Sequence, residues 1–517
     1  MNGFATARVA AGVLASTGML RPVGPVRLLR MAAAFRRHGV NLPAAVAAGA
    51  ARWPDRPALI DDDGPVTFPE LYRRVGDLAA DLADRYGLRA GRRLGVLCRN
   101  HRGFVEAALA GSWLGAELVF LNTDFSRPQL AEVLKREDVH VLMHDDEFSA
   151  LAGDLPVTLV SAECDRRPGG SRRPPPPYRG HGRIVILTSG TTGTPKGAAR
   201  DTDPARFALP LTTMLTQLRL RSGEPMLVLP PLFHGFGLAY LAIALVLGSP
   251  LVLCRRFEPE RALELAERHR VRSMFAVPVM LQRILRLPPH LRDGRRTGLL
   301  RAVGSAAAPL SPDLAAEFQD VFGDVLFNLY GSTETSWSTI ATPADLRAAP
   351  GTVGRPARGI EVRVLDEHGR ELPAGRIGTV FVGSRMAFHG YTGGGGKEVV
   401  RGLLNTGDVG HFDQAGRLFI DGRADDMIVS GGENVYPQEV EDLLAGHPGL
   451  LDVVVRGVED EEFGQRLAAR AVRVPGGTVT EDELKAYVKA NLARYKVPRE
   501  IEFVDELPRT ASGKLRR

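Results

Sequence analysis

Short apolar runs alternate with stretches of helical periodicity along most of the chain. Residues 68–86 repeat apolar side chains at the helical spacing, which predicts an amphipathic helix. The apolar runs that follow predict strands, and such alternation is typical of α/β layers. The expected strands are residues 93–98, 117–121, 139–143, 226–229, 250–253 and 273–277, with a helix at residues 103–115. We therefore expect an α/β fold of layered sheets and helices.

The pattern changes after residue 422 to that of a smaller α+β domain. Thr480 and Glu483 have the spacing of a capping box, which marks the start of a helix. The elements expected in this part are a helix from residues 440–445, strands at 452–455 and 470–474, and a helix from 480 to near Tyr495. A chain of 517 residues is too long for one hydrophobic core. The expected parts are an extension at residues 1–45, a large domain at 46–422 and a small domain at 423–517.

The positive charge of the chain is concentrated at its N-terminus. The net charge is +6, and the 54 residues before Asp55 contain seven arginines and no acidic residue. The rest of the chain carries 59 basic against 60 acidic residues. The basic residues lack interleaved aromatic residues, and no recognition module for nucleic acid is visible, so we expect no nucleic-acid partner.

Within this extension, residues 26–39 predict a basic amphipathic helix. Its apolar face consists of Leu28, Met31, Ala32 and Phe35, and its opposite face of Arg27, Arg30 and Arg37. A helix of this kind commonly lies on an anionic membrane surface. The alternative is a helix that packs on the protein's own surface with its arginines in solvent. The sequence leaves both interpretations open.

Cysteine usage and the apolar stretches favour a cytoplasmic protein. Cys98, Cys164 and Cys254 are far apart and odd in number, which suits a reducing compartment better than a disulfide framework or a zinc site. The apolar stretch at residues 9–20 is too short to span a bilayer. We expect a cytoplasmic location, with peripheral attachment to the inner face of the cell membrane if residues 1–40 bind lipid.

The most informative motif is the run from Leu187 to Gly197, which follows an apolar strand-like segment. Glycines let a backbone wrap around an anion, while hydroxyl groups add donors and a lysine adds positive charge. The residues that would hold a phosphate group are Thr188, Ser189, Gly190, Thr191, Thr192, Gly193 and Lys196. A Walker P-loop is excluded, because it requires adjacent Gly-Lys and here Thr194 and Pro195 intervene. The alternative is a flexible loop between two strands.

This run resembles the phosphate-binding signature of the adenylate-forming superfamily, which includes acyl-CoA synthetases, nonribosomal adenylation domains and beetle luciferases. Further segments similar to the family's motifs follow in the family's order at residues 328–335, 351–356, 405–408, 422–434 and 507–514. The resemblance extends from residue 45 to residue 517. It implies a large adenylation domain and a mobile C-terminal lid joined by a hinge at Asp425.

The resemblance implies that ATP activates a carboxylate by adenylation, with Mg²⁺ on the phosphates. Catalysis of such transfers depends chiefly on positioning and charge neutralisation. Lys514 would contact the carboxylate and the α-phosphate, Asp408 would bind the ribose diol, and Tyr330 would stack on adenine. Catalytic roles fall to Lys514, Thr333, Glu334 and His234, with Glu334 as the Mg²⁺ ligand. The nucleotide would contact Ala307, Ala308, Tyr330, Gly331, Asp408 and Arg423.

Two further segments indicate which kind of acid is activated and which thiol accepts the acyl group. Residues 230–237 resemble the family's acyl-site segment, with His234 at the pocket wall. The apolar helix predicted after it, at residues 238–247, offers no acid to pair the ammonium of an amino acid, so an apolar carboxylic acid is expected. Ser430, Gly431 and Gly432 resemble the loop that lines the pantetheine tunnel. No carrier domain follows Arg517, so coenzyme A is the expected acceptor.

Together these features predict an ATP-dependent fatty acid–CoA ligase for medium- to long-chain acids. The glycine-rich stretch at residues 391–397 and the sequence Leu403-Leu404-Asn405 depart from the usual pattern and resemble a subgroup of actinobacterial fatty acyl-CoA synthetases. One alternative is a fatty acyl-AMP ligase or stand-alone adenylation enzyme that loads a carrier protein. The other is a catalytically silent scaffold that docks to a membrane.

Overall fold

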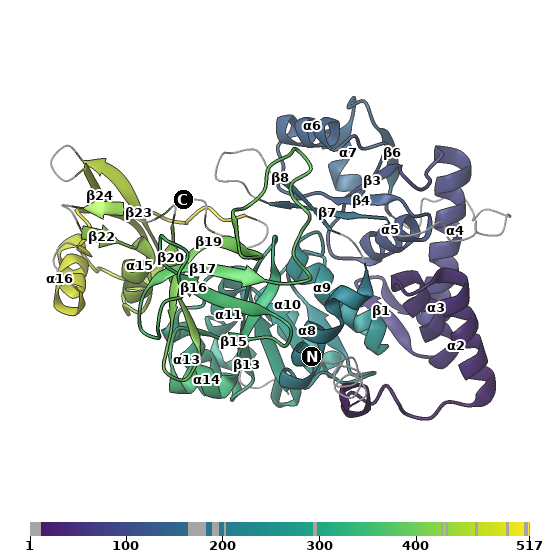
Figure 1. Cartoon of the computed structure of the whole chain (residues 1–517), viewed down its shortest axis with the longest axis horizontal. Helices are drawn as coiled ribbons and strands as arrows, with labels where there is room; N and C mark the ends of the chain where they lie inside the picture. The colour runs from purple at the N-terminus through teal and green to yellow at the C-terminus, as the bar shows by residue number, and fades with distance from the viewer. Residues whose placement is uncertain are drawn as a thin grey trace. The chain divides into compact units, whose positions relative to one another are not determined.

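The structure, a computed structural model, describes residues 12–163, 182–188, 196–200, 203–292, 297–424, 426, 428–430, 433–460, 464–492, 496–510 and 515. The chain divides into two compact units. The first comprises Met1–Gly304, Thr333–Ser336 and Arg385–Gly396, and the second comprises Ser305–Ser332, Trp337–Ser384 and Lys397–Arg517. Helices and strands alternate along the chain, which confirms the predicted α/β class (Figure 1).

The first unit contains a six-stranded sheet in the order β6-β5-β3-β4-β7-β8. Its strands are parallel except for β8, which pairs with β7 in the antiparallel sense. The strands are β3 (Arg93–Leu97), β4 (Glu117–Phe120), β5 (Val141–His144), β6 (Thr158–Ser161), β7 (Ile184–Thr188) and β8 (Lys196–Arg200). The neighbouring helices are α4 (Phe68–Tyr86), α5 (Arg102–Trp113), α6 (Arg127–Arg136) and α7 (Ser149–Ala152). The first three strands and the first two helices agree with the prediction.

Local signals explain why α4 has the bounds that its periodicity predicts. The side chain of Thr67 accepts a hydrogen bond from the backbone N–H of Glu70 and so caps the first turn. Gly87 follows the last turn with a φ of 63°, a left-handed conformation that ends a helix at little cost for glycine. The apolar stripe between these two signals is buried.

Six further strands of the first unit follow the order β12-β11-β9-β10-β1-β2. They are β1 (Pro57–Asp61), β2 (Gly64–Thr67), β9 (Met226–Val228), β10 (Leu251–Leu253), β11 (Ser273–Ala276) and β12 (Ala302–Ser305). The helices are α8 (Pro204–Gln217), α9 (Gly235–Leu247), α10 (Pro259–Arg268), α11 (Pro278–Leu285) and α12 (Pro289–Arg292). Strands β9, β10 and β11 are parallel and buried throughout, as continuous apolar runs predict.

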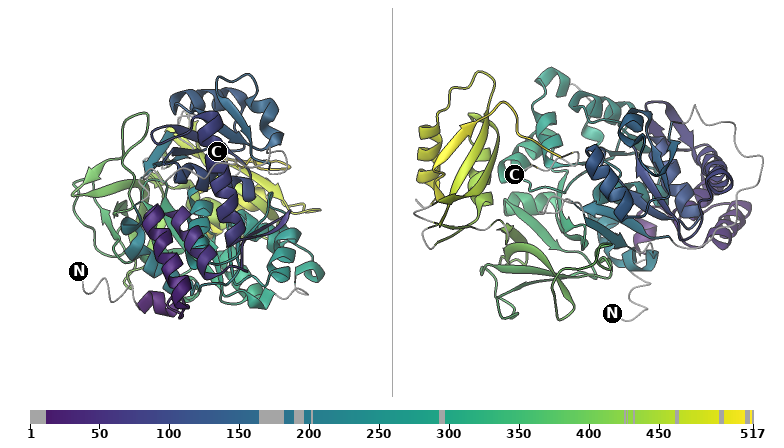
Figure 2. Two further views of the ribbon diagram at one scale, coloured as in Figure 1. Left: turned by 90° about the vertical axis from the view of Figure 1, so that its right-hand side faces the viewer. Right: turned by 90° about the horizontal axis from the view of Figure 1, so that it is seen from above.

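Near the N-terminus, α2 (Pro25–His38) packs on α3 (Leu42–Arg52), which packs on α4 (Figures 1 and 2). The helix predicted at residues 26–39 is therefore confirmed, but it packs through Met31, Ala34 and His38. Its predicted apolar face lies largely in solvent, with Leu28 56% and Phe35 40% exposed. Within the described ranges, no helix has both the length and the apolar character needed to cross a membrane.

The second unit contains a largely antiparallel run of strands in the order β16-β17-β19-β20-β15-β14-β13, with β18 paired to β19. These strands are β13 (Leu326–Ser332), β14 (Ser336–Ala341), β15 (Thr352–Pro356), β16 (Glu361–Leu365), β17 (Gly378–Gly383), β18 (Val399–Val400), β19 (Leu403–Phe412) and β20 (Leu418–Arg423). The helices are α13 (Pro312–Phe322) and α14 (Pro343–Ala348). This arrangement places the Asn-Thr-Gly-Asp segment within β19, paired with β20.

The end of the second unit forms a separate sheet in the order β22-β21-β24-β23, with β25 parallel to β24. Its elements are β21 (Ile428–Ser430), β22 (Glu433–Val435), α15 (Pro437–Ala445), β23 (Leu450–Asp460), β24 (Gly464–Arg473), α16 (Glu481–Asn491) and β25 (Glu500–Phe503). Both halves of the predicted capping box between Thr480 and Glu483 are present. The helix ends at Asn491, earlier than predicted, and Tyr495 lies outside the described residues. The boundary at residue 422 stays a prediction.

Candidate functional site

The predicted phosphate-binding run connects two paired strands of the first unit. Thr188 at the end of β7 lies opposite Lys196 at the start of β8, so the run between them joins the strands of a hairpin. Ser189, Gly190, Thr191, Thr192 and Gly193 lie outside the described residues. Lys196 is exposed, and its Nζ lies 5.6 Å from the centroid of the Tyr391 ring. The lysine thus stands at the carboxyl end of β7, an edge at which α/β sheets commonly bind ligands.

Glu334 belongs to the turn between β13 and β14, and Tyr391 contacts its carboxylate. The Tyr391 hydroxyl donates a hydrogen bond of 2.7 Å to Glu334 Oε1, and the backbone N–H of Phe388 donates to the Glu334 carbonyl at 2.8 Å. Tyr391 therefore touches both Glu334 and Lys196, which the sequence assigned to the metal and to phosphate. Tyr391 was not among the predicted site residues, although an aromatic residue two positions before a run of four glycines was a usable signal.

Thr333 is partly buried in the same turn as Glu334. The Glu334 carboxylate is a hard oxygen ligand of the type that Mg²⁺ prefers, so the residue fits the predicted role. The assignment of Mg²⁺ to Glu334 stays a prediction.

A partly buried arginine, Arg200, connects the end of β8 to two other segments of the first unit. Its Nη1 donates to the Ser336 hydroxyl and, at 3.3 Å, to the Met386 carbonyl. Nε and Nη2 are buried without a hydrogen-bond partner in the described part of the chain. Burial lowers the pKa of this guanidinium to about 10, and the charge of Glu334 opposes that shift. Arg200 thus places a partly buried positive charge near the predicted metal ligand, and the sequence did not indicate this role.

The glycine that follows Lys196 is required by close packing. The backbone N–H of Thr392 donates to the Gly197 carbonyl at 2.8 Å, and the Thr392 hydroxyl donates to Glu137 at 2.7 Å. A Cβ atom at Gly197 would lie 2.5 Å from the Thr392 hydroxyl oxygen and 2.7 Å from the Glu137 carboxylate. Any larger residue at this position would push the 385–396 segment away from β8.

His234 caps the N-terminus of α9. Its Nδ1 accepts a hydrogen bond of 3.3 Å from the backbone N–H of Phe236, and the imidazole is partly buried. Inside the unit, the Phe236 ring packs edge-on against Tyr240 and Phe275. The structure thus gives His234 a definite local role as a helix cap, and its predicted place at the acyl-pocket wall stays a prediction.

In the second unit, Tyr330, Asp408 and Arg423 form one hydrogen-bonded group. The Tyr330 hydroxyl donates to Asp408 Oδ2 at 2.5 Å, and Arg423 Nη1 donates to Oδ1 at 3.4 Å. Asp408 and Arg423 are directly paired across β19 and β20, which explains their approach. Burial, and then the charge of Asp408, hold the pKa of the Tyr330 hydroxyl well above its ordinary value, so it remains a donor. Three residues predicted to contact the nucleotide are therefore linked through Asp408.

The segment after β12 contains a residue with an unusual backbone conformation. Ala307 has a φ of 74°, a left-handed conformation that is uncommon for a residue with a Cβ atom. Ala307 and Ala308 are partly exposed, and Gly331 at the end of β13 is exposed. Their small size leaves backbone accessible, as expected where a flat base would lie, and their contact with adenine stays a prediction.

Ser430 is the residue of the predicted pantetheine loop that the structure describes. Ser430 ends β21 and is paired with Glu433 of β22. Gly431, Gly432, Asp425 and Lys514 lie outside the described residues. Their roles stay predictions.

The first unit also contains a group of potential metal ligands that form hydrogen bonds within the protein. Atoms of Cys98, His101 and Asp145 all lie within 4.8 Å of one another, and the three residues are buried. His101 Nδ1 accepts from the Gly103 backbone at 3.1 Å, and Nε2 bonds to Asp145 at 2.6 Å. Both ring nitrogens are therefore engaged, and the cluster is best explained as a buried hydrogen-bond network.

Comparison with known proteins identifies the family of both parts of the chain. Residues 46–392 match the AMP-binding enzyme family, and residues 439–514 match the AMP-binding enzyme C-terminal domain. Together the two matches span most of the chain and include every predicted site residue except those at positions 408–432.

Individual relatives agree with this result. A feruloyl-CoA synthase of Amycolatopsis sp. is 34% identical over 461 residues, covering 87% of this chain and 92% of that protein. The fatty acid–[acyl-carrier-protein] ligase ScoC of Streptomyces coeruleorubidus is 30% identical over 490 residues, covering 90% and 92%. The structure of o-succinylbenzoate CoA synthetase (MenE) from Bacillus subtilis with the acyl-adenylate OSB-AMP superposes with a TM-score of 0.81 at 29% identity, covering 91% and 96%.

Proposed function

We propose that this chain, which belongs to the AMP-binding enzyme family, activates a medium- to long-chain fatty acid and transfers the acyl group to coenzyme A. The comparisons support an AMP-forming acid–CoA ligase that uses ATP, Mg²⁺ and coenzyme A. The choice of a fatty acid and the roles of individual residues are the proposal.

In the first half-reaction, a carboxylate oxygen attacks the α-phosphorus of ATP, the bond to the bridging oxygen breaks, and pyrophosphate leaves. Catalysis requires that the charge on the phosphates be neutralised and the oxygens be held in place. Lys196 would contact the leaving phosphates, Thr333 would donate to the α-phosphate, and Glu334 would hold Mg²⁺. Tyr391, which contacts both Lys196 and Glu334, would fix their positions. Mg²⁺ itself would supply charge neutralisation at the phosphates.

The hydrogen-bonded group in the second unit suits the nucleoside part of ATP. Each carboxylate oxygen of Asp408 has more than one acceptor site, so it can bind a ribose hydroxyl while it holds Tyr330 or Arg423. Because the Tyr330 hydroxyl is anchored on Asp408, the orientation of its ring is fixed before adenine stacks on it. Lys514 would contact the α-phosphate and the carboxylate of the acid.

The composition of α9 is the observation on which the proposal of a fatty acid rests. From Gly235 to Leu247 this helix contains no charged residue, and Phe236 and Leu238 remain partly exposed. A charged group buried against such a surface would lack a partner, whereas a hydrocarbon would not. The name of the relative ScoC, a fatty acid ligase, supports an alkyl chain. The name of the other relative, a feruloyl-CoA synthase, represents the alternative that the acid is aromatic.

A second candidate function differs only in the acceptor. In the second half-reaction, a thiol attacks the acyl carbon and AMP leaves, and the thiol of a carrier protein could replace that of coenzyme A. ScoC is named for transfer to an acyl-carrier protein and covers nearly the whole chain, which favours this candidate over others.

The experiment that separates these possibilities uses full-length protein with ATP and Mg²⁺. Hexanoate, dodecanoate, hexadecanoate, ferulate and 2-succinylbenzoate are each offered with coenzyme A or with a holo-acyl carrier protein, and AMP and thioester are quantified. We expect the highest kcat/KM for dodecanoate or hexadecanoate with coenzyme A, and none for Glu334→Gln. A preference for ferulate or 2-succinylbenzoate would refute the fatty-acid proposal. Transfer only to the carrier would establish the second candidate, and no AMP with any acid would favour the scaffold.

A further inference from the structure

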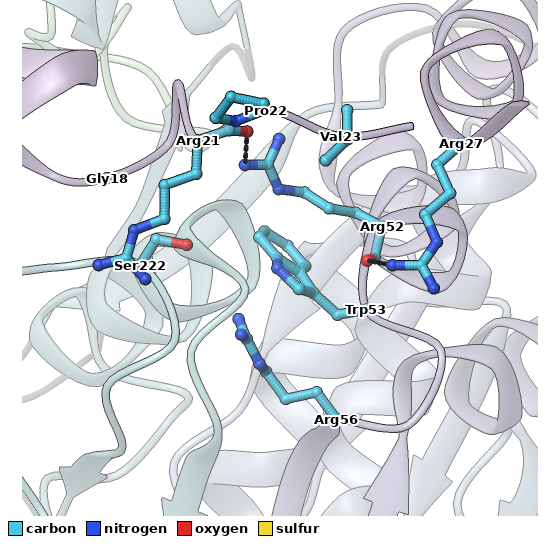
Figure 3. Close-up of a pocket in the computed structure, with 9 residues that line it drawn as sticks. All are labelled: Gly18, Arg21, Pro22, Val23, Arg27, Arg52, Trp53, Arg56 and Ser222. Atoms are coloured by element: carbon cyan, nitrogen blue, oxygen red, sulfur yellow. Dashed lines mark hydrogen bonds between the residues drawn. The ribbon is translucent and has the colours of Figure 1, made fainter. Parts of the chain in front are cut away.

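Four arginines of the first unit line a cavity of about 170 Å³ beside the N-terminal helices (Figure 3). Arg21, Arg27, Arg52 and Arg56 belong to this lining, and the ring of Trp53 lies among them. The Cζ atoms of Arg52 and Arg56 lie 5.1 and 4.9 Å from the centroid of that ring. No acidic residue lines the cavity, and none of the four arginines forms an ion pair in the part of the chain that the structure describes.

Backbone carbonyl groups, rather than carboxylates, hold three of these side chains in place. Arg52 Nη2 donates to the Arg21 carbonyl at 3.0 Å, Arg27 Nη1 to the Arg52 carbonyl at 3.4 Å, and Arg56 Nη1 to the Gly248 carbonyl at 3.0 Å. Arg52 Nε is buried without a hydrogen-bond partner among the described residues. Each guanidinium has five N–H donors, so most donors of the cluster remain available to a ligand.

The positive charge of the four arginines is not balanced by an acidic residue in the lining of the cavity. Burial lowers the pKa of Arg52, and burial together with the charges of Arg52 and Arg21 lowers that of Arg56. Four like charges around one cavity repel one another, whereas an anion placed there would be attracted to all four. A phosphate group matches best, because its several oxygens accept from guanidinium forks in pairs.

The surroundings of the cavity indicate where such a phosphate group would come from. Leu20, next to Arg21, is 58% exposed, and Val26, next to Arg27, is 61% exposed. Leu29 on the same helix is 71% exposed. A soluble phosphate would gain nothing from apolar side chains nearby, whereas a lipid bilayer would bury them.

We propose that Arg21, Arg27, Arg52 and Arg56 bind the phosphate group of an anionic phospholipid and so attach the N-terminal helices to a membrane surface. The exposed apolar residues Leu20, Val26 and Leu29 then enter the lipid beside the bound headgroup. This site is separate from the ligase residues and does not depend on the proposed acid substrate.

The first test compares two variants that remove the same charge. Full-length protein is sedimented with vesicles of phosphatidylcholine alone or with phosphatidylglycerol. Arg21→Gln/Arg27→Gln removes two lining residues, whereas Arg30→Gln/Arg36→Gln removes two arginines of α2 outside the cavity. The lining variant should lose at least about tenfold more affinity for phosphatidylglycerol vesicles, because it removes charge-assisted hydrogen bonds. Equal losses would indicate diffuse attraction and would overturn the proposal.

The second test uses the fluorescence of Trp53 to report on the cavity itself. Phosphatidylglycerol vesicles should change the emission of wild-type protein, and Trp53→Phe should remove the change while Trp113 and Trp337 remain. Arg21→Gln/Arg27→Gln should weaken it while keeping wild-type circular dichroism and wild-type activity on a soluble short-chain acid. A Trp53 response to sn-glycerol 3-phosphate but not to vesicles would identify a soluble phosphate ligand and overturn the lipid assignment. No response to either probe would overturn the site.

Discussion

Replacing Tyr330 with phenylalanine tests the nucleotide group of the second unit. The variant keeps an aromatic ring for stacking on adenine and removes only the hydroxyl that donates to Asp408 Oδ2. Asp408 is buried, so without this donor one of its oxygens loses its strong partner. Arg423 Nη1 donates to the other oxygen at 3.4 Å, which is too long a hydrogen bond to compensate.

The size of the effect follows from the geometry of this bond. A separation of 2.5 Å places it among the short hydrogen bonds to a charged acceptor. Such bonds contribute about 1.5–3 kcal/mol, and 2 kcal/mol corresponds to about a thirtyfold change in affinity. We expect Tyr330→Phe to raise KM for ATP by about thirtyfold, with a smaller change in kcat, since the ribose is held in both ground and transition states.

The assay is pyrophosphate release at varied ATP and varied 2′-deoxy-ATP. If Tyr330 orients Asp408 toward the ribose, wild-type enzyme should discriminate strongly between the two nucleotides, and Tyr330→Phe should discriminate less. Tyr391→Phe is the matched control, because it removes a tyrosine hydroxyl from Glu334 instead and should alter the Mg²⁺ dependence. An unchanged KM for ATP with unchanged discrimination in Tyr330→Phe would refute the role of this group.

Four further outcomes are expected. Lys514→Ala should lower adenylation roughly a hundredfold or more but still form thioester from presynthesised acyl-AMP; equal loss in both assays would contradict its role. Asp425→Pro should retain adenylation and lose thioester formation, because proline fixes φ at the predicted hinge. Normal consumption of coenzyme A by this variant would show that the hinge lies elsewhere. Arg200→Met should lower Tm and adenylation together, with partial recovery in Arg200→Lys; a wild-type Tm in Arg200→Met would show that the buried bonds of this residue contribute little. Burial, and then Arg37, lower the pKa of His38 from 6.5 to about 4, so the folded state binds fewer protons between these values. Its contribution to stability is therefore present above pH 6.5 and lost as the pH falls toward 4, and His38→Gln should flatten this part of the Tm profile.

The elements that the sequence predicted well are those whose signals are local. The bounds of α4 follow from the cap at Thr67, the glycine at position 87 and the apolar stripe between them. The start of α16 follows from the capping box at Thr480 and Glu483. Each signal lies within one helix, so no knowledge of distant contacts was needed.

Contacts between distant segments could not be predicted in the same way. Tyr391 and Glu334 are 57 positions apart, and Tyr330 and Asp408 are 78 apart. The motifs identified three of these four residues, but periodicity gives no information on which side chains meet across a fold. Arg200 was missed because a single arginine in a short strand resembles a surface residue, whereas its burial depends on the segments that cover it.

The packed face of α2 shows a limit of the apolar pattern itself. The predicted face of Leu28, Met31, Ala32 and Phe35 was expected to contact either a membrane or the protein, yet only Met31 of these four packs, together with Ala34 and His38. His38 is accommodated because its Nε2 bonds to the Tyr72 hydroxyl at 3.0 Å and its ring packs against Trp113. A polar residue with such partners can replace an apolar one in a core, which amphipathicity alone does not reveal.

The most direct test of the proposed function is acid-dependent exchange of labelled pyrophosphate into ATP by wild-type enzyme without coenzyme A. Exchange reports the first half-reaction alone, so it does not depend on the acceptor. We predict exchange with dodecanoate that requires Mg²⁺, saturates with the acid, is lost in Glu334→Gln, and exceeds the exchange with ferulate. Exchange that is absent with every carboxylic acid, or that is fastest with an aromatic acid, would contradict the proposal.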